Sequence, residues 1–241
     1  MLELFTPEIL ASLATLTILE IVLGIDNIIF ISIVASRLPK AQQPLARKLG
    51  LLGALVIRLL FLTLIAWIIG LEATLFNAFG IDFSWKDLIL IGGGLFLLTK
   101  GTTEIHENIE GDAEHLITRG KAAKNLFATI IVQIMVLDVV FSIDSILTAI
   151  GMTQVIWVMA VAIIISIAVM MWAIAPISAF VERHPTVKML ALSFLLLIGM
   201  ALIADGLDFH IPRGYLYFAV AFSMFVEGLN LAAKRRRRKK Q

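Results

Sequence analysis

The chain of 241 residues contains no cysteine and only four histidines. The absence of cysteine excludes disulfide bonds, thiolate metal sites and thiol nucleophiles, and so few histidines leave little for a zinc or copper site. Charged residues make up only 16% of the chain, whereas soluble domains have about a quarter. Hydrophobic residues make up 60%, with a mean hydropathy of +0.97. This composition predicts an integral membrane protein.

The apolar residues are gathered into seven segments, each suited to cross about 30 Å of hydrocarbon as a helix of about 20 residues. We therefore expect an all-α, polytopic fold in a single transmembrane domain. Acidic residues precede the first segment, so no cleavable signal peptide is expected. The chain has no GxxxxGK[ST] phosphate loop, which argues against a nucleotide-driven pump. The predicted spans are 8–34, 48–70, 87–104, 125–149, 154–180, 188–207 and 213–232.

The lysines and arginines predict the orientation, because basic residues of short loops stay in the cytoplasm. Of the twenty basic residues, seventeen fall on one side of a seven-helix arrangement, including a run of seven in the tail 234–241. The other side has only Lys86 and Arg213, and Arg58 lies inside the second span. The N-terminus is therefore predicted outside and the C-terminus in the cytoplasm. Beside a hydrophobic span, the basic tail indicates a membrane flank rather than a nucleic-acid site.

One acidic pattern occurs twice within these apolar segments. Glu20, Asp26 and Asn27 in the first span match Asp138, Asp144 and Ser145 in the fourth, and each matched pair is 118 positions apart. The first and fourth helices must run in opposite directions, so the spacing predicts two inverted three-helix repeats over about 8–104 and 125–207, with the seventh helix added. Such an arrangement brings matched residues together near the membrane midplane.

Four buried carboxylates would cost roughly 10–14 kcal/mol if nothing compensated them. Together with amide, hydroxyl and freed backbone oxygens they would suit a hard divalent cation such as manganese, magnesium or calcium. A local helix break at Gly24 and Ser142 would help Glu20 and Asp26 to converge. The alternative is that the acids are protonated and only join helices by hydrogen bonds. The predicted metal ligands are Glu20, Asp26, Asn27, Asp138, Asp144 and Ser145.

At these residues the chain resembles the TerC family of integral membrane proteins. The resemblance rests on TLTILEIVLGIDNIIFISIVASRLP, KGTTEIHENIEG, VQIMVLDVVFSIDSILTAIGM and FSMFVEGLNL. It implies a transporter with inverted repeats, and several members of the family are linked to manganese export or tellurite resistance. It also implies the metal-ligand role for the four acids, and a multi-pass protein of the plasma (inner) membrane of a bacterium.

Other charged residues have simpler interpretations. Arg58 is expected to be a structural counter-ion, with a gating role as the alternative. The acidic segment 104–115 is expected to be a solvated loop that balances nearby lysines and arginines, although it could collect cations. Glu227 is expected to be structural. Asp205 and Asp208 are expected to be solvated loop residues, with an exit vestibule as the alternative.

The sequence thus predicts a secondary transporter that exports a divalent metal, with manganese as the leading candidate and proton antiport as the energy source. It is not expected to be an enzyme: an intramembrane aspartyl hydrolase is disfavoured because each half has its acids on one helix. The rival is a membrane assembly protein that delivers metal to exported enzymes through partners. The expected partners are membrane lipid, the transported cation and a homo-oligomeric or exported-protein partner, with no prosthetic cofactor.

Overall fold

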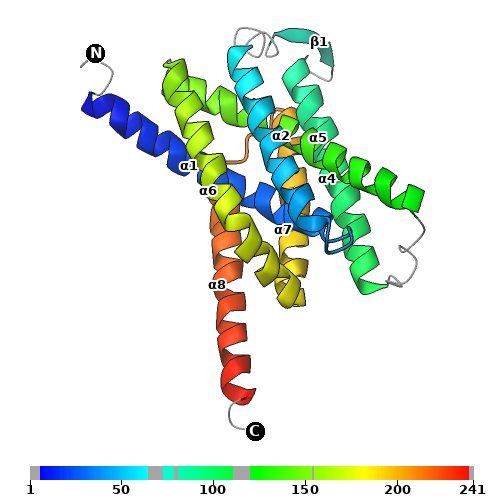
Figure 1. Ribbon diagram of the computed structural model, residues 1–241. Helices are drawn as coiled ribbons and strands as arrows, with labels where there is room; N and C mark the ends of the chain where they lie inside the picture. Colours follow the sequence, from blue (N-terminus) through cyan, green and yellow to red (C-terminus); the bar gives the residue numbers. More distant parts are fainter. Residues whose placement is uncertain (1–5, 65–72, 79–80, 111–119, 154, 239–241) are drawn as a thin grey trace.

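A computed structural model describes residues 6–64, 73–78, 81–110, 120–153 and 155–238. Within these residues the chain forms seven long helices and one short hairpin (Figure 1). The hairpin pairs two antiparallel strands. The elements are α1 (Pro7–Ala35), α2 (Gln43–Thr63), β1 (Thr74–Ala78), β2 (Ile81–Ser84), α4 (Trp85–Ile109), α5 (Gly120–Met152), α6 (Ile156–Arg183), α7 (Pro185–Gly206) and α8 (Arg213–Arg238).

The helices follow the predicted spans, with differences at their ends. The α2 and α5 helices each begin five residues earlier than predicted, at Gln43 and Gly120. The α2 helix runs to Thr63, and residues 65–70 of its predicted span lie outside the described residues. The hairpin of β1 and β2 was not predicted. The α4 helix continues to Ile109, so residues 105–109 are helical rather than part of a loop. The α8 helix runs through Arg238, beyond the predicted end at residue 232. Arginine and lysine are good helix formers, so nothing in the basic run stops that helix.

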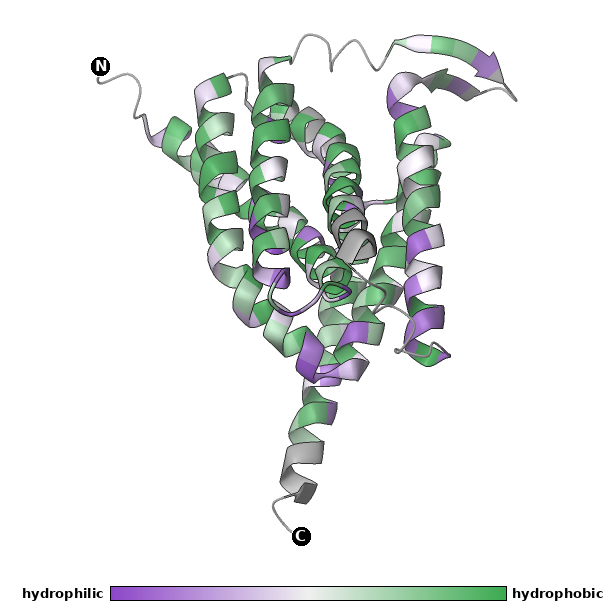
Figure 2. Cartoon of the chain, turned by 45° about the vertical axis from the view of Figure 1, so that its right-hand side comes forward, coloured by the Kyte–Doolittle hydropathy of each residue, from purple (hydrophilic) through white to green (hydrophobic). Residues whose placement is uncertain are grey.

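The prediction of an all-α, polytopic membrane protein is confirmed. Six of the described helices contain a stretch long and apolar enough to cross a membrane, and hydrophobic residues make up most of the helical ribbon (Figure 2). The α2 helix is not among the six because Arg47, Lys48 and Arg58 lie within its 21 residues. We call the end of the bundle with β1 and β2 the hairpin end, and the opposite end the tail end.

The helices pack in pairs that an exchange of the two halves would predict. The α1 helix contacts α6, and α2, its neighbour in the chain, contacts α5. If the exchange of halves replaces α1 by α5 and α2 by α6, it turns the α1–α6 contact into the α2–α5 contact. The same exchange leaves three other contacts unchanged, and all three are present: α1 with α5, α2 with α6, and α4 with α7. The α8 helix contacts α7, and its C-terminal part projects beyond the bundle (Figure 1).

Glycine allows two of these pairs to approach closely. A Cβ atom at Gly94 in α4 would overlap the backbone carbonyl oxygen of Gly199 in α7, and one at Gly199 would meet the carbonyl oxygen of Gly94 at 3.0 Å. Close backbone approach through small residues is a common way for membrane helices to associate. Gly24 in α1 lies in the same way against the thioether of Met170 in α6.

The predicted helix breaks are wrong, because α1 and α5 are continuous through Gly24 and Ser142. Gly24 serves the contact with α6 rather than a kink. The Ser142 hydroxyl donates to Asp138 Oδ2 at 3.1 Å, one turn earlier in the same helix, instead of opening the backbone. The two acids of each copy therefore do not converge by unwinding of their own helix.

Replacing Gly94 by alanine should destabilise the bundle, because the added methyl group would push apart the α4 and α7 backbones. Overpacking of this kind costs about 1–3 kcal/mol. Gly92 provides a matched control on the same helix, since nothing lies within 4 Å of its Cβ position. Thermal unfolding in detergent should show a lower midpoint for Gly94→Ala and an unchanged or higher one for Gly92→Ala. Equal midpoints would contradict the close α4–α7 contact.

Candidate metal site at the centre of the bundle

Polar side chains from three helices meet in the middle of the bundle, where hydrocarbon would otherwise surround them. All of them are less than 9% exposed to solvent. Residues of α1 and α5 come from the two copies of the acidic pattern, and α2 adds an arginine. The group consists of Glu20 and Asn27 from α1, Arg58 from α2, and Asp138, Ser142 and Ser145 from α5.

Arg58 bridges the first acids of the two copies. Its Nη1 atom donates to Glu20 Oε2, and its Nη2 and Nε atoms donate to Asp138 Oδ1 at 3.1 and 3.3 Å. The Arg58 side chain is only 2% exposed. The structure thus brings Glu20 and Asp138 to different nitrogen atoms of one guanidinium group, although they are 118 positions apart in the chain.

One neutral member of the motif connects the two copies. Asn27 of the first copy donates from Nδ2 to Asp138 Oδ1 of the second at 3.5 Å. Ser145, its counterpart in the second copy, is buried and donates from its hydroxyl to the Ser142 carbonyl oxygen of its own helix at 3.3 Å.

Asp26 and Asp144 lie on α1 and α5, but their side chains are outside the described part of the structure. Among the side chains that are described, no three histidine, aspartate or glutamate residues are grouped closely enough to hold a metal. The structure therefore brings together Glu20, Asn27, Asp138 and Ser145 of the six predicted ligands. The full ligand set stays a prediction.

Two residues take part in the site in ways that the sequence did not predict. Arg58 was expected to be a structural counter-ion, and it pairs with two acids at once. The contact of Ser142 with Asp138 could have been predicted from the sequence, because residues four positions apart share one face of a helix. No sequence signal pairs Arg58 with Asp138, because that contact depends on how α2 packs against α5.

Small cavities lead from this site toward the hairpin end. One of about 50 Å³ is bordered by Arg58, Ser145, Asp205 and Tyr217, and by apolar residues of α1, α7 and α8. It has room for water, which needs roughly 10–15 Å³. A second, of about 10 Å³, borders Glu20 beside Leu62 and Met159. Asp205, expected to be a solvated loop residue, instead lines a cavity that reaches the site.

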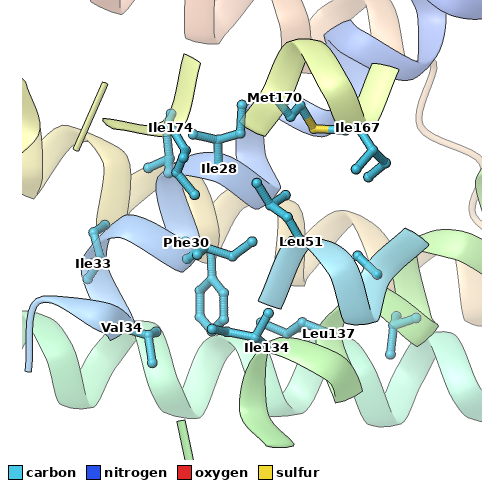
Figure 3. Close-up of a cluster of buried hydrophobic side chains, with 14 of the residues drawn as sticks. Ile28, Phe30, Ile33, Val34, Leu51, Ile134, Leu137, Ile167, Met170 and Ile174 are labelled. Atoms are coloured by element: carbon cyan, nitrogen blue, oxygen red, sulfur yellow. The ribbon is translucent and has the colours of Figure 1, made fainter. Parts of the chain in front are cut away.

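A packed apolar cluster lies on the tail side of the site (Figure 3). Its α1 members follow Glu20, and its α2 and α5 members precede Arg58 and Asp138, which places them toward the tail end. All are 9% exposed or less. Packed apolar side chains thus lie on the tail side of the site among the described residues. The cluster includes Ile28, Phe30, Ile33, Val34, Leu51, Ile134, Leu137, Ile167, Met170 and Ile174.

Ion pairs join helix ends at the tail end. Arg37 pairs with Glu104 at 2.5 Å and also with Glu107, and Arg47 of α2 pairs with Glu182 of α6 at 2.6 Å. Residues 104–109 are helical and Glu104 is buried, so the predicted loop is wrong there, whereas residues 106–110 are exposed to solvent as predicted. Residues 111–119 are outside the described part. Glu227 accepts a hydrogen bond from Thr186, which is a structural contact.

Comparison with known proteins agrees with this architecture. The model of the integral membrane protein TerC family matches residues 5–241, almost the whole chain. The chain belongs to the TerC family of integral membrane proteins. The resemblance inferred from the motif segments is thus confirmed. No solved structure gives a significant match.

Several relatives of this TerC-family chain carry names that give a location. It is 53% identical over 225 residues to the UPF0053 inner membrane protein YgdQ of Escherichia coli, covering 93% of both chains. It is 51% identical over 229 residues to a UPF0053 protein of Haemophilus influenzae, covering 95% and 96%. The UPF0053 inner membrane protein YoaE of Escherichia coli is 49% identical over 232 residues, but the match covers only 44% of that longer protein.

Replacing Arg58 by methionine should destabilise the protein by about 3–5 kcal/mol, because two buried carboxylates lose their partner. Adding Glu20→Gln and Asp138→Asn to Arg58→Met should recover part of that loss. Arg47→Met is the control: its partner Glu182 is 42% exposed, so about 1 kcal/mol or less is expected. Chemical denaturation in detergent would measure all three. A milder effect at position 58 than at position 47 would contradict the bridging role.

Proposed function

We propose that this protein is a secondary transporter that exports a divalent metal cation from the cytoplasm, with manganese as the leading candidate. The observation that carries the proposal is that Glu20 and Asp138, the first acids of the two matched copies, both contact the buried guanidinium group of Arg58. Two helices of opposite direction each contribute a carboxylate to the same point. A hard divalent ion is the class of ligand that such oxygen atoms prefer.

Charge supports a cation rather than an anion as the cargo. Arg58 supplies one positive charge against Glu20 and Asp138, and it is the only basic residue in the described centre of the bundle. Asp26 and Asp144 would add two carboxylates within two turns of this point. Intramembrane acids are expensive and usually mark an ion path.

Transport would proceed by alternating access of two inverted three-helix repeats around the site. Opening toward the tail end would separate the apolar cluster shown in Figure 3 and the Arg47–Glu182 ion pair, which joins α2 to α6. Four carboxylates exceed the charge of Arg58 plus one divalent ion, so we infer that protons move in exchange. In this proposal the hairpin end faces outward and the basic tail lies at the cytoplasmic surface, in contact with anionic lipid.

The proposal predicts manganese flux in proteoliposomes that contain only this protein. Asp26→Asn/Asp144→Asn and Glu20→Gln/Asp138→Asn should each lower the flux by about tenfold or more, since the loss of a ligand carboxylate weakens binding of a hard cation. A pH gradient should change the wild-type rate if protons are exchanged. Manganese entry, measured with a trapped fluorescent indicator, gives both results.

The control is Glu8→Gln, which removes a carboxylate from the exposed first turn of the same helix. It should leave the flux unchanged. Flux that survives both double substitutions would contradict the site. Binding of manganese without any flux would favour the rival function, a membrane protein that delivers metal to a homo-oligomeric or exported partner.

A further inference from the structure

Arg58 has no counterpart in the second half of the protein. The position 118 residues later is Pro176, and α6, the helix matched with α2, has no basic residue before Arg183. The carboxylates are duplicated but the cation between them is not. Each half thus supplies one carboxylate to this point, and the first half alone supplies the guanidinium that holds both of them.

The Arg58 guanidinium stands where a divalent cation would bind. Its nitrogen atoms are within hydrogen-bonding distance of Glu20 and Asp138, and the Asn27 amide approaches the same Asp138 oxygen. A metal ion cannot take those carboxylate oxygens while the guanidinium holds them. Binding of the ion therefore requires Arg58 to move, and a charged side chain needs another polar place inside a membrane.

The cavity beside the site offers that place. Arg58 and Asp205 both line it, together with Ser145 and Tyr217, and it encloses about 50 Å³. Asp205 lies in the last turns of α7, toward the hairpin end. A long flexible side chain that leaves Glu20 and Asp138 would thus enter a space with a carboxylate on its far side and room for water.

We propose that Arg58 is a built-in competitor of the transported cation: it occupies the Glu20–Asp138 site when the ion is absent and swings toward Asp205 when the ion binds. This inference rests on the proposed function and names the residues that regulate the same site. With Arg58 in place, the empty protein keeps its two carboxylates compensated. With Arg58 turned to Asp205, the site accepts a divalent ion.

The test is manganese binding to the purified full-length protein in detergent, followed by the loss of the free-ion electron paramagnetic resonance signal. Arg58→Gln should tighten binding by about tenfold or more, because no arginine side chain then occupies the Glu20–Asp138 site in part of the molecules. Asp205→Asn should weaken binding by about threefold or more, since Arg58 loses its alternative partner. In the Arg58→Gln background, the Asp205→Asn change should have no further effect.

This pattern separates competition from a purely structural role, which would make Arg58→Gln bind more weakly as it unfolds. Arg58→Lys keeps the charge and should bind with wild-type or intermediate affinity, so it tests the idea even if Arg58→Gln fails to fold. Arg37→Gln is the matched control: it removes the Glu104 and Glu107 pairs at the tail end and should leave the affinity unchanged.

Weaker binding by Arg58→Gln and Arg58→Lys, or equal effects of Asp205→Asn in both backgrounds, would overturn the proposal while the metal site remained. Absence of manganese binding in the wild type and in every variant would overturn the proposed function itself. Thermal unfolding without manganese, measured on the same samples, reports folding independently of affinity, and the rise in midpoint on adding manganese gives a second measure of binding.

Discussion

The cost of buried charge is the constraint on which the centre of this protein depends. Two carboxylates and a guanidinium lie among apolar helices with almost no exposure to solvent, and each would be expensive there alone. These side chains contact one another only while α1, α2 and α5 hold them within hydrogen-bonding distance. The surrounding packing can therefore be understood as the support of one charged cluster.

The rest of the bundle is built in a different way. The α4 and α7 helices meet through Gly94 and Gly199, where backbones touch and no charge is involved. Close contact of this kind favours one fixed arrangement, because an added methyl group has nowhere to go. The acidic helices α1 and α5 contact α6 and α2 through larger apolar side chains (Figure 3) and also through glycine, since Gly24 lies against Met170 and Gly50 of α2 lies against Ile134. Backbone thus meets backbone in the α4–α7 pair, whereas these two glycines of α1 and α2 pack against side chains.

Much of this could be read from the sequence because the signals are strong and local. Hydropathy located the helices, and the spacing of 118 residues predicted that Glu20 and Asp138 would meet. The hairpin was missed because β1 and β2 fall between the predicted spans 48–70 and 87–104, and strands of five and four residues give too short a pattern to stand out. The predicted break at Gly24 was wrong because a glycine in a helix can serve close packing, and Met170 is 146 positions away. The double contact of Arg58 and the cavity beside Asp205 depend on the three-dimensional arrangement of several helices, which no local pattern encodes.

The α8 helix joins two places that have so far been described separately. Leu216, Tyr217 and Val220 near its beginning form part of the cavity wall, and the same unbroken helix continues to Arg238. Its 26 residues form a rod of about 39 Å at 1.5 Å per residue. Because an α-helix is stiff over such a length, the arginine-rich end and the residues of the cavity wall are two parts of one rigid element. A tilt of α8 would therefore displace both together.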